Sequence, residues 1–267
     1  ARGMAKAGWR VRVAVRRPNE AIFVKPYGVV GQVEPVLCNI RDDGAVAAVM
    51  QGADAGVNCG GILARQGKNT FEAVQAEGAA RIARIAAEQG VAQMVQISAI
   101  GADPESASEY ARTKARGEAA VLEHMPEAVI LRPSIVFGTE DQFFYRFAGM
   151  SRLGPVLPVV GADTKFQPVY VDDVAQAAEV ALTTDLAGGV YEMSGPDVST
   201  FRSLLEPMLE VIRRRRLIVN IPFWAAGLMG MGFGLANRLT LGLFPAQLTR
   251  DQVRNLAVDN VVAEGAR

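Results

Sequence analysis

Two side chains in one stretch of the sequence, Tyr110 and Lys114, have the types and the spacing for acid–base chemistry. Four residues apart on a helix places them on one face, so the Lys114 ammonium can lie beside the Tyr110 phenol. A neighbouring cation lowers the pKa of a tyrosine, which suits a proton donor or acceptor near neutral pH. The same ammonium can hold ribose hydroxyls. Ser98, which ends the apolar run 94–97, supplies a further hydroxyl.

The stretch 91–118 positions these groups. It predicts a buried strand, a loop rich in Gly, Asp, Pro and Ser, and then the helix that carries Tyr110 and Lys114. Elsewhere, strands are expected at 9–15, 33–40, 54–61 and 128–132, and helices at 42–51 and 69–89. Strands that alternate with helices indicate a parallel sheet covered on both faces. We therefore predict an α/β, Rossmann-like doubly wound fold.

A small, discontinuous second domain is expected beside this sheet, because the pattern changes to short mixed segments after Gly138. The nucleotide-binding domain is predicted to comprise residues 1–135 and 166–187. The smaller domain, of a substrate-binding or docking type, is predicted to comprise residues 136–165 and 188–267.

The usual phosphate-binding loop of such folds is not found in the sequence. A doubly wound nucleotide-binding domain has a Gly-rich turn directly after its central first strand. No G-x-G-x-x-G pattern precedes Trp9, and the residues before it read as the end of a helix that stops at Gly8. We expect the central strand and the phosphate loop to lie outside the given sequence.

The predicted strand ends supply candidate cofactor contacts, because ligands of open α/β sheets bind at the carboxyl ends of the strands. Arg16 and Arg17 follow the first predicted strand, where an acidic residue would select NAD and an arginine favours the 2′-phosphate of NADP. A solvated basic pair at a turn is the alternative. Asn39 and Ile40 end the next strand, near the expected position of adenine.

The third predicted strand ends in Asn58, Cys59 and Gly60, where glycine lets the backbone approach a cofactor. Cys59 and Cys38 are expected on strands too far apart to bridge, and we predict both to be small buried side chains. Two cysteines cannot form a disulfide framework, which favours a reducing compartment.

Composition excludes several classes of function. The 28 basic and 28 acidic residues balance, so no overall positive charge favours nucleic acid. The single histidine, His124, is expected at the end of a helix on the surface. A metal site or a Ser-His triad cannot be built from it, and no metal is predicted.

Three motifs resemble the extended short-chain dehydrogenases/reductases: Tyr110-x-x-x-Lys114, Leu131-Arg-Pro-Ser-Ile-Val-Phe-Gly138 and Gln167-Pro-Val-Tyr-Val-Asp-Asp-Val174. More narrowly, the runs 125–143, 147–158 and 166–174 are similar to the NADPH-binding accessory subunit of respiratory complex I. So is the late run Leu248-Thr-Arg-Asp-Gln-Val-Arg-Asn-Leu256. The resemblance covers nearly the whole chain.

The resemblance implies a bound NADPH with a structural role, in a subunit on the peripheral arm of complex I near the membrane. Lys114 would hold the nicotinamide ribose, and Arg16 or Arg17 would meet the 2′-phosphate. The segment that lines the nicotinamide would be Pro133, Ser134 and Ile135. Tyr110 and Ser98 occupy the catalytic positions of the wider family.

This sequence departs from the active family at Ala99 and Ile100, where working enzymes often carry a serine. A missing hydroxyl removes a hydrogen bond to the substrate oxygen. The alternatives are a free NADP-dependent reductase, epimerase or dehydratase that uses Tyr110 and Lys114, and a regulatory protein that senses the cofactor.

A late basic and apolar region bears on partners. Residues 213–216 are four consecutive arginines, and the stretch 221–244 is largely apolar. Its glycines and an Asn-Arg pair disfavour a membrane-spanning helix. Two interpretations of this stretch remain. It forms a helix packed on the smaller domain, or an apolar helix that faces a partner or anionic lipid. Other complex I subunits would be the partners, at the cytoplasmic face of a bacterial inner membrane or the matrix face of the mitochondrial one.

Overall fold

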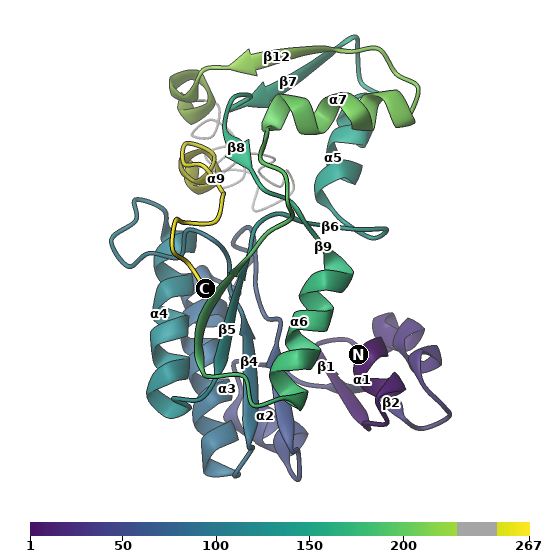
Figure 1. Cartoon of the computed structure of the whole chain (residues 1–267), viewed down its shortest axis with the longest axis vertical. Coiled ribbons are helices and arrows are strands. Elements are labelled where there is room, and N and C mark those ends of the chain that lie inside the picture. Colours follow the sequence, from purple (N-terminus) through teal and green to yellow (C-terminus); the bar gives the residue numbers. More distant parts are fainter. Residues whose placement is uncertain (229–249) are drawn as a thin grey trace. The chain divides into compact units, whose positions relative to one another are not determined.

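The computed structural model describes residues 1–228 and 250–267 of the chain (Figure 1). Of the predicted apolar stretch 221–244, residues 229–244 therefore lie outside the described residues. The chain divides into two compact units. The first unit comprises Ala1–Ser98, Thr113–Arg132 and Asp172–Tyr191. The second comprises Ala99–Arg112, Pro133–Val171 and Glu192–Arg267.

Strands and helices alternate in the first unit. In chain order its elements, four of which extend slightly beyond it, are α1 (Arg2–Lys6), β1 (Val11–Val15), the 3-10 helix η1 (Pro18–Tyr27), β2 (Val33–Leu37), α2 (Asp43–Met50), β3 (Ala55–Asn58), the π-helix η2 (Glu72–Ala76), α3 (Glu77–Glu88), β4 (Gln93–Ile97), α4 (Glu109–His124), β5 (Val129–Pro133), α6 (Val171–Thr183) and β10 (Gly189–Met193). This order matches the alternation that the sequence predicts.

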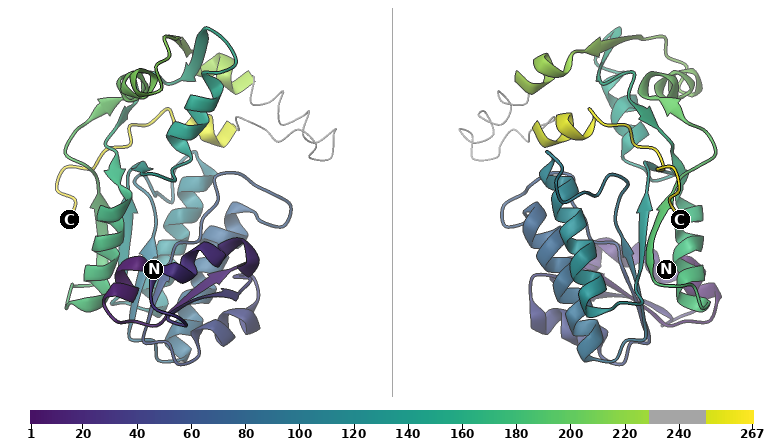
Figure 2. Two further views of the ribbon diagram at one scale, coloured as in Figure 1. Left: turned by 90° about the vertical axis from the view of Figure 1, so that its right-hand side faces the viewer. Right: turned by 60° about the vertical axis from the view of Figure 1, so that its left-hand side comes forward.

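Two sheets form from these strands. A four-stranded sheet has the order β10-β5-β4-β3, and β1 pairs with β2 in a sheet of its own. The β3–β4, β4–β5 and β1–β2 pairs are all parallel. Helices α3 and α4 lie on one face of the four-stranded sheet and α6 on the other (Figure 2). The prediction of an α/β, Rossmann-like fold with parallel strands is confirmed.

Small residues let α3 and α4 pack closely in the core of the first unit. Ala83 of α3, Val121 of α4 and Ile130 of β5 are fully buried in one apolar cluster. At Gly117 of α4, an added Cβ would lie 2.1 Å from the backbone oxygen of Gln75. Gln75 belongs to the π-helix that precedes α3, so the predicted single helix over 69–89 is wrong in detail.

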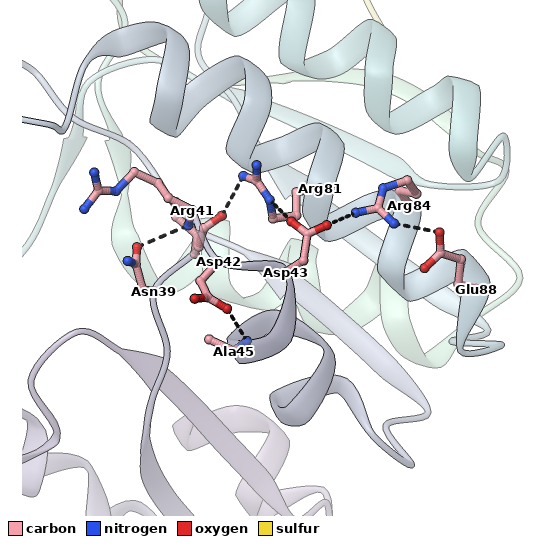
Figure 3. Close-up of polar contacts among 9 residues, drawn as sticks. Asn39, Arg41, Asp42, Asp43, Ala45, Arg81, Arg84 and Glu88 are labelled. Atoms are coloured by element: carbon pink, nitrogen blue, oxygen red, sulfur yellow. Dashed lines mark hydrogen bonds and ion pairs between the residues drawn. The ribbon is translucent and has the colours of Figure 1, made fainter.

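An ion-pair network joins the start of α2 to α3 (Figure 3). The Asp43 carboxylate accepts hydrogen bonds from Arg81 and from Arg84, whose Nη2 lies 2.6 Å away. Arg81, and then Arg84, hold the pKa of Asp43 below its usual value. Arg81 also donates to the Ile40 carbonyl at 3.0 Å, and Asp42 caps α2 by accepting from the Ala45 amide at 2.8 Å. The network thereby fixes the segment that follows β2.

The second unit is built from short elements. They are β6 (Val136–Phe137), α5 (Phe143–Met150), β7 (Val156–Val160), β8 (Lys165–Phe166), β9 (Val169–Tyr170), β11 (Ser199–Thr200), α7 (Phe201–Val211), β12 (Leu217–Ile221) and α9 (Arg250–Asn255). Three two-stranded sheets pair β6 with β9, β7 with β12 and β8 with β11.

An aromatic cluster forms the core of this unit. Phe201, at the start of α7, is only 2% exposed. Its ring centroid lies 5.4 Å from that of Phe143, 5.2 Å from that of Phe147 and 5.5 Å from that of Phe166. Such stacked and edge-on ring pairs add to the free energy gained from burying apolar area. The aromatic side chains therefore join α5, β8 and α7 into one core.

Candidate dinucleotide-binding site

Ser98 follows the carboxyl end of β4 and has a buried hydroxyl. Its amide donates to the Leu131 carbonyl of β5 at 2.7 Å, which fixes its backbone in line with the sheet. The side-chain oxygen has no hydrogen-bond partner in the described part of the chain. Leaving a buried hydroxyl unpaired costs free energy. A polar group of a bound ligand would satisfy it, which fits the predicted role of Ser98 as a site residue.

Lys114 lies in the first unit with only 7% of its surface exposed. Its Nζ donates to the Ile97 carbonyl at 3.2 Å, next to Ser98. Burial lowers the pKa of Lys114 to about 8, although the Glu118 carboxylate opposes this shift. Helix α4 thus places the buried Lys114 ammonium at the carboxyl end of β4. There it can donate hydrogen bonds to ligand hydroxyls.

Two amide side chains order the ends of β3 and β4. Asn58 Nδ2 donates to Gln96 Oε1 at 2.8 Å, and Asn58 Oδ1 accepts from the Gly60 amide at 2.8 Å. Both amide residues are buried. Gln96 was not among the predicted site residues, although a glutamine inside an apolar strand is the signal that could have shown it. The pair fixes the backbone at Gly60, near Lys114.

Cys59 differs from its prediction. It is exposed and free, whereas Cys38 is buried and free as expected. The difference arises because β3 ends at Asn58 and the chain leaves the sheet before Cys59. The thiol therefore lies on the turn at the strand end.

The two predicted arginines after β1 have different surroundings. Arg17 Nη1 lies 2.8 Å from Glu20 Oε1, and hydrogen bonding to Glu20 raises the pKa of Arg17. Arg16 is exposed, and no ion pair or hydrogen bond of its side chain is found in residues 1–228 and 250–267. Arg16 is therefore the cation that remains available at the end of β1.

Asn39 and Ile40, after β2, are held by their neighbours. Asn39 Oδ1 accepts from the Arg41 amide at 3.2 Å, and the Ile40 carbonyl accepts from Arg81. The turn at the end of this strand is therefore fixed before any ligand binds.

Tyr110 lies in the first turn of α4, in the second unit. Its amide donates to Asp251 Oδ2 at 3.0 Å. Burial raises the pKa of Tyr110 to about 12. The predicted lowering of this pKa is thus wrong, because burial disfavours the charged phenolate. At neutral pH the phenol is a neutral hydrogen-bond donor.

The segment after β5 is engaged by other parts of the second unit. The Pro133 carbonyl accepts from the Ile100 amide at 3.1 Å, and the Ile135 carbonyl accepts from Val169 at 2.9 Å. Ser134 Oγ donates to Asn260 Oδ1 at 2.6 Å. Asn260 was not predicted, and no local pattern near Ser134 indicates it. Pro133, Ser134 and Ile135 thus have a defined backbone.

The predicted residues fall into three groups. Within the first unit, the ends of β3 and β4 bring together Asn58, Cys59, Gly60, Ser98 and Lys114. The ends of β1 and β2 carry Arg16, Arg17, Asn39 and Ile40. The second unit holds Tyr110 and the segment Pro133, Ser134 and Ile135. All but Tyr110 and Lys114 follow or end a strand at its carboxyl end, where open α/β sheets bind ligands.

The parallel α/β unit is the fold of the extended short-chain dehydrogenases/reductases, an NAD(P)-binding family. The family model of the RmlD substrate binding domain matches residues 38–210. The crystal structure of dTDP-4-dehydrorhamnose reductase from Bacillus anthracis in complex with NADP shares the fold. Its TM-score is 0.62 at 18% identity, over 92% of this chain and 98% of that one.

Within this class, the chain belongs to the family of NADH dehydrogenase [ubiquinone] 1 alpha subcomplex subunit 9. It is 35% identical to the mitochondrial member from Arabidopsis thaliana, over 98% of this chain and 67% of that protein. The NADH-ubiquinone oxidoreductase 40 kDa subunit of Neurospora crassa is 32% identical over 82% of this chain and 58% of its own length. Ceramide reductase from Caulobacter vibrioides is 29% identical, over 83% of this chain and 68% of that protein. The chain thus spans about three fifths to two thirds of these relatives.

Proposed function

We propose that this chain is an accessory subunit of respiratory complex I that holds NADPH in a structural, non-catalytic role. The observation that carries the proposal is its membership in the subunit 9 family along nearly the whole chain. The raised pKa of Tyr110, to about 12, supports a holding role, because a phenol of this pKa is a poor acid or base near neutrality. A ligand that binds only the folded state would also stabilise the subunit.

NADPH is the proposed cofactor because a free arginine stands where such folds select the 2′-substituent. Arg16 would pair with the 2′-phosphate, whereas Arg17 already pairs with Glu20. Lys114 and Ser98 would bind the ribose and nicotinamide end, and Pro133, Ser134 and Ile135 would line the nicotinamide. Asn39 and Ile40 would border the adenine, and Asn58, Cys59 and Gly60 would approach the cofactor with their backbone.

Arg16→Gln tests this selection, with Arg17→Gln as the matched control. A charged hydrogen bond to phosphate is worth enough that its loss should weaken NADPH binding by about 10- to 100-fold. NADH binding should stay the same, since NADH has no 2′-phosphate. Calorimetric titration of both variants with both dinucleotides measures the effect. Equal affinity of the unaltered protein for NADH and NADPH would contradict the proposed selection.

Assembly is tested by mild-detergent solubilisation of membranes, native-gel separation and analysis of the released nucleotide. We expect the chain to migrate with NADH:quinone oxidoreductase and to carry NADPH in near-equal amount. A free monomer or dimer with readily exchanged cofactor would overturn the proposal.

The location we propose is the peripheral arm near the membrane, on the cytoplasmic or the matrix face. None of the helices in the described ranges has the length and apolarity to cross a bilayer. Of the predicted basic run, Arg214 Nη1 donates to Ser151 Oγ at 3.0 Å and Arg216 Nε to the Ser151 carbonyl at 2.7 Å. These two arginines therefore hold the end of α5. Contact of the remaining basic and apolar residues of 213–244 with partner subunits or lipid remains part of the proposal.

The domain division also enters as a proposal. Residues 1–135 and 166–187 would bind the dinucleotide in a doubly wound arrangement. Residues 136–165 and 188–267 would dock on the complex.

A free NADP-dependent reductase is the second candidate. The retained Tyr110 and Lys114 on α4 favour it, together with the similarity to a ceramide reductase. A reductase would oxidise NADPH in the presence of a carbonyl substrate, and the Tyr110→Phe variant would not. Such a result would favour the reductase hypothesis over the structural role.

A further inference from the structure

The carboxylate of Asp251 binds the first turn of α4 from the far end of the sequence. Asp251 lies on α9, and its Oδ1 accepts from the Glu109 amide at 2.7 Å. Its Oδ2 accepts from the Tyr110 amide at 3.0 Å and from Ser108 Oγ at 2.9 Å. One side chain thus receives three hydrogen bonds at the start of the helix that carries Tyr110.

This arrangement completes the hydrogen bonding of the helix start. The first amides of an α-helix have no partner inside the helix. Ser108 Oγ accepts from the Ala111 amide at 3.3 Å, as a local cap does. Asp251 accepts from the two amides, of Glu109 and Tyr110, that this cap leaves open. Its negative charge is also favourable at the amino end of a helix.

Asp251 is itself held in place by the tail around it. Arg254 of the same helix donates to the Ala107 carbonyl at 3.1 Å. The Leu256 carbonyl accepts from Thr164 Oγ1 at 2.6 Å, and Asp259 Oδ1 accepts from the Lys165 amide at 2.8 Å. The carboxylate position is therefore set by several bonds to loops and strands of the second unit.

We propose that Asp251 is a positioning residue for Tyr110. The C-terminal tail places this carboxylate so that the first turn of α4 keeps one backbone geometry and presents Tyr110 in a fixed place. The tail also holds Ser134 through Asn260. Tyr110, at a catalytic position of the wider family, thus depends on Asp251, and Ser134, expected to line the nicotinamide, depends on Asn260. The link to the cofactor rests on the proposed function, whereas the effect on α4 does not.

Hydrogen–deuterium exchange of the full chain without nucleotide tests the effect on α4. In Asp251→Ala, the amides of Glu109 and Tyr110 should exchange about tenfold faster, because each loses a charge-assisted hydrogen bond. Asp251→Asn keeps one acceptor oxygen and should give an intermediate rate. Asp141→Ala is the matched control: it also removes a carboxylate that accepts from an amide at the start of a helix, that of Phe144 at 2.7 Å, but the helix is α5. It should leave residues 108–112 unchanged.

An unchanged exchange rate at residues 109 and 110 in Asp251→Ala would overturn the proposal. An equal rise in β3, β4 and β5 would also overturn it, because Asp251 would then support the fold in general.

NADPH titration of the same three variants tests the second step. We expect weaker binding in Asp251→Ala, a smaller loss in Asp251→Asn, and binding by Asp141→Ala equal to that of the unaltered chain. Equal binding in all variants despite faster exchange would overturn the positioning of Tyr110 for the cofactor. If the unaltered chain binds no NADPH, the proposed function fails, while the exchange rates still decide whether Asp251 positions the helix.

Discussion

The two units bury different kinds of polar group. In the described chain, the buried polar residues of the second unit are all hydroxyl residues, namely Ser108, Ser134, Ser151 and Thr164. The first unit buries amides and charges as well, namely Asn58, Gln75, Gln96, Lys114 and Glu118. Burying such groups costs free energy unless they are paired. The first unit must therefore pair amides and charges inside its core, whereas the second unit needs partners for hydroxyls alone.

Pairing in the first unit is close to complete. Arg132 donates to both oxygens of Glu118, at 2.9 and 2.6 Å, in the bidentate geometry that suits a guanidinium and a carboxylate. Gln75 Nε2 donates to Thr113 Oγ1 at 3.1 Å. Among the buried side-chain nitrogen and oxygen atoms of the described residues, Ser98 Oγ alone has no hydrogen-bond partner. This unpaired hydroxyl lies at the carboxyl end of β4.

The largest expected effect concerns the aromatic core of the second unit. Phe201→Ala removes a ring that contacts three others and should destabilise the protein by about 3–5 kcal/mol. Leu153→Ala, at a residue that is 88% exposed, should change stability by less than about 0.5 kcal/mol. Urea unfolding followed by circular dichroism measures both. A loss of similar size in the two variants would show that aromatic packing does not dominate this unit.

The Lys114→Met variant tests the effect of burying a charged group in the first unit on the stability of the protein. The pKa of Lys114 is lowered from 10.5 to about 8 in the folded chain. Between these values the unfolded chain holds a proton that the folded chain lacks, so stability rises with pH in this window. At about 1.4 kcal/mol per pKa unit, raising the pH from 7.5 to 9.5 should add about 2 kcal/mol. Unfolding without nucleotide at both pH values should show this rise.

The Met variant should lose this rise and be the more stable protein at pH 7.5. Lys165→Met, at an exposed lysine of the second unit, should keep it. A rise that persists in Lys114→Met would assign the pH dependence to another group.

Gly117→Ala tests the close approach of α4 to the π-helix within the first unit. Alanine normally stabilises a helix interior relative to glycine. At Gly117 the new Cβ would lie 2.1 Å from the Gln75 carbonyl oxygen, so the helix must shift and the protein should lose about 1–3 kcal/mol. Gly149→Ala on α5 meets nothing within 4 Å and should be neutral or slightly stabilising. Thermal unfolding compares the two. Equal shifts would mean that α4 adjusts without strain.

Local patterns predicted most elements and the strand-end residues, because apolar periodicity and turn residues act over a few positions. The spacing of Tyr110 and Lys114 placed both on α4, but spacing does not report burial, so the direction of the Tyr110 pKa was wrong. The π-helix at Glu72–Ala76 and its close approach to Gly117 depend on packing between helices. Asp251 and Asn260 bond to Ser108 and Ser134 from 143 and 126 residues away, and no pattern of that length was available.

The bond between Ser108 and Asp251 also has a consequence for synthesis of the chain. The 143 residues that separate the two take about 7 to 30 s to add at typical rates of translation. Throughout this interval α4 can form on the ribosome, but the amides of Glu109 and Tyr110 have no carboxylate to bind. A nascent or stalled chain that ends before residue 251 therefore exposes an open helix end.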